Sequence, residues 1–263
     1  MNIEILYEDN HILCAVKPAG ILSQADETGA PDMLTLLKAY VKQKYGKSGE
    51  AYLGLVHRLD RPVGGAMAFA RTSKAAGRLS EQFRSRAVKK TYFAVLDGSP
   101  AGDAGLLEHS VAKDRLLNRV SVTPHAGPGK SGKDYASLGY AVLGRADGLT
   151  LVRITPHTGR PHQIRAQFAF IGCPVAGDRK YGGNRSDAES LHKSAAESLR
   201  QSVSAPTQRQ RLAGDIPLSL WSAGLEFVHP VRRTPLAVCA PPPAGYPWSL
   251  FDNKYYVLDN ERN

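Results

Sequence analysis

Short apolar runs separated by turn residues dominate the first half of the chain. Residues 3–8 alternate polar and apolar positions with a period of two, and a second apolar run at 12–16 follows a turn at Asp9. This period places successive side chains on opposite faces of a strand. Further strands are predicted at 66–70, 89–96, 149–155 and 218–227, with several short ones between 101 and 148.

A smaller set of segments shows the 3.6-residue period of an amphipathic helix. Residues 32–45 place Leu34, Leu37 and Val41 on one face. Helices are also predicted from Thr72 or Ser73 to about Arg86, and from Pro161, whose ring suits the first position of a helix. Strands outnumber helices and are mixed with them, so the pattern predicts an α+β fold with a mainly antiparallel sheet and flanking helices.

The chain shows no internal repeat and no interdomain linker, so residues 1–263 are predicted to form one domain. Residues 184–215 are rich in Ser, Ala, Gln and charge, and we expect them to form an exposed insertion. An apolar content of 42% excludes a disordered polar chain. No apolar stretch reaches the roughly 20 residues that cross a bilayer, and the N-terminus lacks the basic region of a signal peptide.

The cysteine content and the charge narrow the class of protein further. Three widely spaced cysteines favour a reducing compartment, so we expect a cytoplasmic protein. The net charge is +10, and the excess is concentrated in two segments. Residues 57–92 hold 9 Lys and Arg against 2 Asp and Glu, and residues 153–180 hold 5 against 1. A polyanion is the expected partner, and nucleic acid is the first candidate.

Three motifs in the basic segments contain side chains suited to chemistry. In Gly54-Leu-Val-His-Arg-Leu-Asp60-Arg-Pro-Val-Gly-Gly65, an acid between two arginines precedes a tight turn, where a carboxylate can act as a nucleophile or base. The same acid can equally cap the turn or pair with an arginine. In Lys89-Lys-Thr-Tyr92, a phenol within a strand can stack on a base, or it can simply pack.

The third motif is Thr155-Pro-His-Thr-Gly-Arg160-Pro-His-Gln-Ile-Arg165. A Gly-Arg turn that leads into a helix suits an anion, because free N–H groups point outward there. Arg165 follows one turn later and is a candidate partner for Asp60, while a surface anion site without chemistry is the alternative. His157 and His162 lack a nearby Cys pair, so no metal site is expected. A glycosidase or nuclease would need a second acid near Asp60, and the motif holds none, so neither class of enzyme is expected.

Taken together and in this order, these motifs resemble the RluA-type family of RNA pseudouridine synthases. The resemblance rests on H-R-L-D-R-P-V-G-G, F-A-R-T-S-K-A-A-G-R-L-S-E-Q-F-R, V-K-K-T-Y and H-T-G-R-P-H-Q-I-R, with further matches at 173–178 and 225–230. It implies an α+β catalytic domain with a central basic cleft. It also implies isomerisation of uridine in RNA to pseudouridine, without a cofactor or a metal and with the target base flipped out of its stack.

The resemblance assigns roles to individual residues. Asp60 corresponds to the family's catalytic carboxylate, Tyr92 to the aromatic residue at the target base, and Arg165 to the partner of the acid. The expected partner is transfer RNA or large-subunit ribosomal RNA, bound by a monomer that has no separate S4-type module. Candidate RNA contacts are His57, Arg58, Arg61, Arg84, Lys89, Lys90, Arg160, His162 and Gln163.

The chain departs from the usual family pattern in two places. The usual D-R-x-T-S-G becomes Asp60-Arg-Pro-Val-Gly-Gly65, which loses two hydroxyl groups. The usual R-V-H after the third motif becomes Arg165-Ala-Gln167. The altered turn leaves one competing hypothesis open, in which the chain is a non-catalytic protein that binds RNA or assists its folding on the same scaffold.

Overall fold

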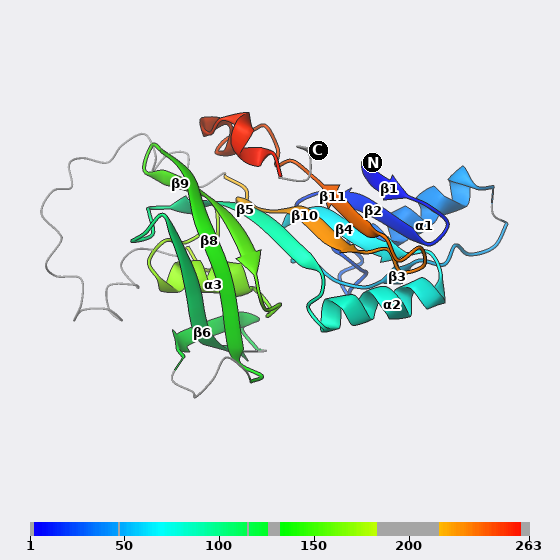
Figure 1. Cartoon of the computed structure of the whole chain (residues 1–263), viewed down its shortest axis with the longest axis horizontal. Coiled ribbons are helices and arrows are strands. Elements are labelled where there is room, and N and C mark those ends of the chain that lie inside the picture. Colours follow the sequence, from blue (N-terminus) through cyan, green and yellow to red (C-terminus); the bar gives the residue numbers. More distant parts are fainter. Residues whose placement is uncertain (1–2, 47, 115, 126–131, 183–215, 259–263) are drawn as a thin grey trace, which may run out of the picture.

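The structure is a computed structural model that describes residues 3–46, 48–114, 116–125, 132–182 and 216–258. The predicted insertion at 184–215 lies outside these residues. The described residues form the α+β fold that the sequence predicts, with a long mixed sheet and three α-helices (Figure 1).

Eleven strands form one sheet, in which β5 occupies a central position between β10 and β9 (Figure 1). The order is β1-β2-β4-β10-β5-β9-β8-β6-β7, with β11 paired to β10 and β3 paired to β4. Among the described strands only β4 and β10 pair in parallel, as the mainly antiparallel prediction requires. The strands are β1 (Ile5–Glu8), β2 (Ile12–Lys17), β3 (Gly54–Leu55), β4 (Gly64–Ala70), β5 (Lys89–Asp97), β6 (Ala104–Asp114), β7 (Arg119–Pro124), β8 (Tyr135–Ala146), β9 (Leu149–Pro156), β10 (Leu220–Val228) and β11 (Pro235–Cys239).

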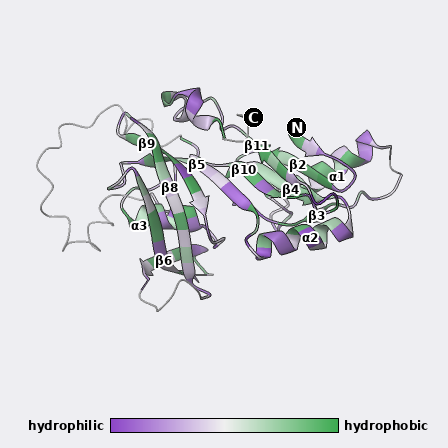
Figure 2. Ribbon diagram, viewed as in Figure 1, coloured by the Kyte–Doolittle hydropathy of each residue, from purple (hydrophilic) through white to green (hydrophobic). Residues whose placement is uncertain are grey.

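The first two predicted helices are confirmed. The side chain of Asp32 accepts the N–H of Thr35 and caps α1 (Met33–Lys44), and Thr72 caps α2 (Ser73–Arg84) in the same way. Leu37 is fully buried in α1, as its apolar period predicts. Figure 2 shows hydrophilic and hydrophobic residues alternating along α2, as expected for a helix with one solvent face. Two 3₁₀ helices follow near the C-terminus, η2 (Trp248–Leu250) and η3 (Asn253–Tyr256).

The predicted start of the third helix is wrong by two residues. Pro161 lies in a turn that closes when Gln163 N–H donates to Arg160 O at 3.2 Å, and α3 (Gln163–Phe170) begins only after it. His162 precedes the helix with φ 50°, a left-handed conformation that a helix cannot continue. Proline's fixed φ suits the second position of such a turn as well as the first position of a helix, so the sequence alone does not separate them.

Val63 and Gly64 are the two positions of the turn after Asp60 that lose a hydroxyl group. Gly64 has a packing explanation, and so has its neighbour Gly65. Gly64 and Gly65 lie opposite Trp221 and Ser222 in the parallel pairing of β4 with β10. A Cβ added at Gly64 would lie 2.2 Å from a carbon of the Trp221 ring. A Cβ at Gly65, whose φ is +115°, would lie 2.2 Å from Ser222 O. The close approach of β10 therefore leaves no room for side chains at these two positions.

This packing predicts opposite effects for two glycine substitutions. Gly64→Ala should lower the free energy of unfolding by about 1–3 kcal/mol, because the methyl group would overlap the Trp221 ring. Gly77→Ala is the matched control: it lies within α2 with open space around its Cβ position, and alanine should raise stability by about 0.5–1 kcal/mol. Urea denaturation of both variants measures the difference. A Gly64→Ala variant as stable as the parent protein would contradict the packing argument.

Candidate active site

Asp60 lies in the turn between β3 and β4, and a neighbouring loop holds this turn from the side. Ser23 Oγ donates to Leu59 O at 2.8 Å and accepts Leu59 N–H at 3.1 Å. Lys17, at the end of β2, donates its ammonium to Arg61 O at 3.0 Å. The residues on both sides of Asp60 are therefore fixed, while the Asp60 side chain retains 30% of its exposure.

Lys17 is a buried cation that the sequence analysis missed. Its side chain is fully buried, and its ammonium also donates to the carbonyls of Pro18 and Ile21. Burial lowers the pKa of Lys17 to about 8, although the negative charge of Asp60 opposes this shift. A lysine at the end of an otherwise apolar strand was the only signal in the sequence that pointed to it.

Arg165 approaches Asp60 from α3, which lies on the opposite side of the central strand β5 from β3 and β4 (Figure 1). Its Nη1 lies 3.5 Å from Asp60 Oδ2. Its Nε and Nη2 donate to the two carboxylate oxygens of Asp178, at 2.7 Å each. The Asp178 side chain is completely buried, and its Oδ1 also accepts two backbone N–H groups. Arg165 is thus held in a short bidentate pair by one acid and makes a longer contact with the other.

Asp178 and Tyr181 were not identified as site residues from the sequence. The Arg165 guanidinium lies 5.1 Å from the centre of the Tyr181 ring. The Tyr181 hydroxyl lies 2.8 Å from His162 Nδ1, and His162 Nε2 lies 3.9 Å from Asp60 Oδ2. The sequence offered one signal for these two residues. The run at 173–178 that matches the family ends on Asp178, and the phenol of Tyr181 follows closely after it.

Tyr92 lies on β5, between the two halves of the sheet. Ser222 Oγ donates to Ala66 O at 3.1 Å, and a side-chain hydrogen bond between Ser222 and the Tyr92 phenol opposes a rise in the pKa of the phenol. Burial, together with the negative charge of Asp60, raises the pKa of Tyr92 to about 12. The phenol is therefore protonated at neutral pH.

Five of the predicted RNA contacts are cations placed at or near the surface. Arg58 is exposed, and Arg61 is exposed with its Nε donating to Gly20 O at 3.0 Å. Lys90 Nζ lies 3.7 Å from the position of a Cβ at Gly159, so it reaches the Gly-Arg turn, and burial lowers its pKa. Arg84 pairs with Glu81 on α2, and Lys89 pairs with Glu226 at 3.5 Å.

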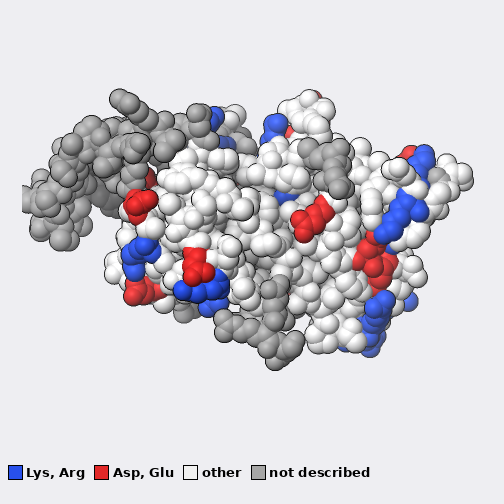
Figure 3. Space-filling view, turned by 90° about the horizontal axis from the view of Figure 1, so that it is seen from above, with Lys and Arg blue, Asp and Glu red and all other residues white. Residues whose placement is uncertain are grey.

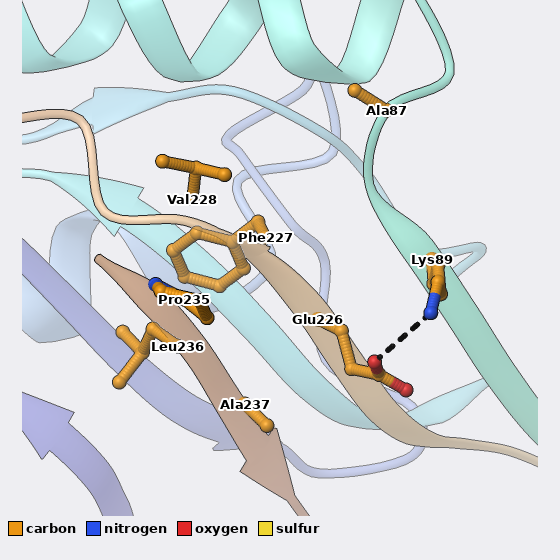
Figure 4. A pocket seen from close by; sticks show the side chains of 8 residues that line it. All are labelled: Ala87, Lys89, Glu226, Phe227, Val228, Pro235, Leu236 and Ala237. Atoms are coloured by element: carbon orange, nitrogen blue, oxygen red, sulfur yellow. Dashed lines mark ion pairs between the residues drawn. The ribbon is translucent and has the colours of Figure 1, made fainter. Parts of the chain in front are cut away.

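Figure 4 shows the pair of Lys89 and Glu226 at a pocket between β5, β10 and β11. The residues that line this pocket do not include Asp60, Tyr92 or Arg165. Lys89 is therefore placed at a hollow separate from the acid.

The remaining candidates also form hydrogen bonds within the protein, and their contact with RNA stays a prediction. Gln163 is buried, and its amide bonds to Thr158, to Arg160 N–H and to a carbonyl of β8. His57 accepts Ala68 N–H at 2.9 Å and stacks on Phe83. The Arg160 guanidinium donates to two backbone carbonyls, at 2.8 and 3.0 Å. Polar side chains in a motif look alike in sequence whether they bond outward to a ligand or inward to the backbone.

The described residues hold neither of two other kinds of site. None of the helices in that part of the chain has the length and apolar character of a membrane span. The same residues bring together no group of three or more His, Cys, Asp or Glu side chains that would bind a metal ion.

Comparisons with known proteins agree on one family. The model of the RNA pseudouridylate synthase family matches residues 11–170. Ribosomal large subunit pseudouridine synthase D of Xylella fastidiosa is 34% identical over 92% of this chain and 66% of its own length. tRNA pseudouridine synthase C of Pasteurella multocida is 29% identical over 91% of both chains.

A solved structure gives the same result for the fold. Human RNA Pseudouridylate Synthase Domain Containing 4 superposes with a TM-score of 0.70 at 26% identity, covering 91% of this chain and 88% of its own. Several curated relatives are longer than this chain, which spans 64% to 66% of the length of the first three.

The internal position of His57 predicts a pH dependence of stability. Burial lowers the pKa of His57 to about 3, whereas its ordinary value is 6.5. Between these values the unfolded chain binds one more proton than the folded protein, so stability should fall as the pH drops below about 6.5. The slope is at most about 1.4 kcal/mol per pH unit from this group.

Urea denaturation at pH 7.5, 6.5, 5.5 and 5.0 measures this slope in the parent protein and in His57→Gln, whose amide oxygen can accept Ala68 N–H. The two proteins should converge as the pH falls, because only the parent loses the contribution of a buried neutral imidazole. The comparison at pH 7.5 provides the control, since both side chains are uncharged there. Parallel profiles at all four pH values would rule out this assignment.

Proposed function

Because the chain belongs to the RNA pseudouridylate synthase family, we propose that it isomerises uridine in structured RNA to pseudouridine, with Asp60 as the catalytic carboxylate. The observation that carries the proposal is an accessible carboxylate whose neighbours are fixed and whose counter-ion is buried. Asp60 keeps 30% of its side-chain exposure, whereas Arg165 keeps 7% and Asp178 none.

The reaction exchanges one bond to the ribose for another. The N1–C1′ bond breaks, the uracil rotates and C5 forms a new bond to C1′. C5 then loses its proton, and N1 ends with one, so the atoms balance without a cofactor. Asp60 starts this sequence either by attacking C1′ or by removing the proton at C2′. Both routes need an ionised carboxylate with one oxygen free of strong hydrogen bonds.

The contacts of Arg165 support this requirement. Its two short bonds go to Asp178, and only the longer 3.5 Å contact reaches Asp60 Oδ2. A short bidentate pair on Asp60 would stabilise the resting carboxylate and lower its reactivity. Asp178 instead holds the guanidinium, so that Arg165 balances the charge of Asp60 without binding both of its oxygens.

Tyr92 is proposed to pack against the flipped uracil. Its phenol is neutral at neutral pH and is tied to Ser222, so it provides an aromatic face beside Asp60 and no negative charge. Removal of the C5 proton by Tyr92 would require a phenolate, which burial and the charge of Asp60 both disfavour.

RNA is proposed to bind along cations near the site, the exposed Arg58 and Arg61 beside Asp60 in sequence and the half-buried Lys90 at the Gly-Arg turn. Phosphate contacts of this kind offset the cost of taking the target base out of its stack. The face in Figure 3 does not suit this role, because blue and red side chains are interspersed on its visible described part. We place the RNA path beside Asp60, where Arg58 and Arg61 are exposed.

We extend the proposal to the setting of the reaction. Relatives are named for large-subunit ribosomal RNA and for transfer RNA, so both classes are candidate substrates. The chain is proposed to act in the cytoplasm, as a monomer and as a single catalytic domain. The hypothesis of a non-catalytic RNA-binding protein rested on the basic segments and on the altered turn, and the space that Trp221 occupies beside Gly64 supplies a structural reason for the glycine in that turn.

Tritium release tests the function directly. RNA labelled with tritium at C5 of uridine, prepared from a strain that lacks the gene, should lose tritium to water when the protein is added. Asp60→Asn keeps the size of the side chain but removes the charge, and it should slow release by about a thousandfold or more. Asp103→Asn, which alters an exposed acid paired with Arg145, is the matched control and should retain the parent rate.

Both ribosomal and transfer RNA fractions belong in this experiment. Equal release by the parent protein and by Asp60→Asn would overturn the role of Asp60. If the parent protein releases tritium from neither RNA class, the proposed function is overturned.

A further inference from the structure

The hydroxyl of Tyr181 lies at a junction between the β6–β7 hairpin and the site. It accepts the N–H of Val120 on β7 at 2.8 Å and lies 2.8 Å from His162 Nδ1. The Tyr181 residue is only 9% exposed; its contact with Val120 is buried and its contact with His162 is partly buried. A single side chain therefore connects β7 to the turn that precedes α3.

Counting hydrogens at this junction defines the state of His162. The Val120 N–H already occupies one acceptor position of the Tyr181 oxygen. The phenol hydrogen has a partner only if it points to His162 Nδ1, which must then carry no hydrogen. The opposite arrangement would leave a buried hydroxyl hydrogen without an acceptor. The neutral imidazole therefore carries its hydrogen on Nε2.

His162 Nε2 faces the same oxygen of Asp60 that Arg165 contacts. It lies 3.9 Å from Asp60 Oδ2, and Arg165 Nη1 lies 3.5 Å from it. Two N–H groups thus converge on Oδ2, while Oδ1 is left for the reaction. The distance from His162 is longer than a hydrogen bond, and contacts of catalytic groups commonly shorten when substrate closes a site.

The charge around His162 is consistent with a neutral ring. Burial lowers the pKa of His162, Asp60 raises it, and the cations Arg165, Lys180 and Lys113 lower it again. The Tyr181 pKa is raised, chiefly by burial, so the phenol keeps its proton.

We propose that Tyr181 is a positioning residue that fixes the Nε2–H tautomer of His162, and that His162 donates this N–H to Asp60 Oδ2 during the reaction. The second half rests on the proposed function, whereas the tautomer is a property of the free protein. Together with Arg165, His162 would restrain one oxygen of the carboxylate and direct the other toward the ribose.

Nitrogen-15 NMR of the histidine-labelled full chain at pH 7.5 tests the tautomer without RNA. The His162 signals are assigned from their loss in His162→Gln. We expect the pattern of an Nε2-protonated ring in the parent protein. In Tyr181→Phe, which keeps the ring over Arg165 but removes the hydroxyl, we expect a mixture of tautomers. An Nδ1-protonated ring in the parent, or an unchanged pattern in a folded Tyr181→Phe, would overturn the assignment.

Tritium release tests the donor role, with two variants that share the same backbone constraint at φ 50°. His162→Ala removes the donor and should lower kcat about 10- to 100-fold with little change in KM. His162→Gln places an amide N–H near the position of Nε2 and should recover at least about tenfold of that loss.

Equal kcat values for His162→Gln and His162→Ala would overturn the donor role, even if NMR confirms the tautomer. If the parent protein releases no tritium at all, the proposed function fails and the donor role fails with it. The NMR result then still decides the tautomer, so the two failures are distinguishable.

Discussion

The division of Arg165 between two acids is the interaction on which the candidate site depends. Two short hydrogen bonds fix the guanidinium on the buried Asp178, and one longer contact reaches the accessible Asp60. Without Asp178, the cation would be free to form a bidentate pair with Asp60 and stabilise its resting state. Without Arg165, Asp178 would be a buried charge with no counter-ion, which is strongly destabilising. Burial of the Arg165–Asp178 pair costs desolvation energy, but it fixes the position of the guanidinium charge beside Asp60.

The fold brings these residues together from distant parts of the chain. Asp60 comes from the turn between β3 and β4, Tyr92 from the central strand β5, and Arg165 from α3 on the opposite half of the sheet (Figure 1). Lys17 and Ser23 fix the backbone on either side of Asp60. The site therefore forms where the two halves of the sheet meet, and the parallel pairing of β4 with β10 fixes one side of that junction.

Much of this arrangement was predictable from the sequence, because periodicity and local motifs determine it. The capped helices at 33–44 and 73–84 follow from their apolar spacing and from Asp32 and Thr72. The sequence did not predict Lys17 or Tyr181 as site residues, because their roles depend on carbonyls and side chains that only the tertiary fold brings near. The inward hydrogen bonds of Gln163 were not predictable for a related reason, because they arise from a turn whose geometry the sequence leaves open.

We infer that Asp178 acts on the reaction only through the position of Arg165. The most direct measurement is single-turnover tritium release at saturating RNA by Asp178→Asn, which keeps the shape of the side chain and removes its charge. We expect a rate about 100-fold below that of the parent protein with unchanged RNA affinity, because the released guanidinium would form a bidentate pair with Asp60 and stabilise its resting carboxylate. A folded Asp178→Asn protein that reacts at the parent rate would contradict it.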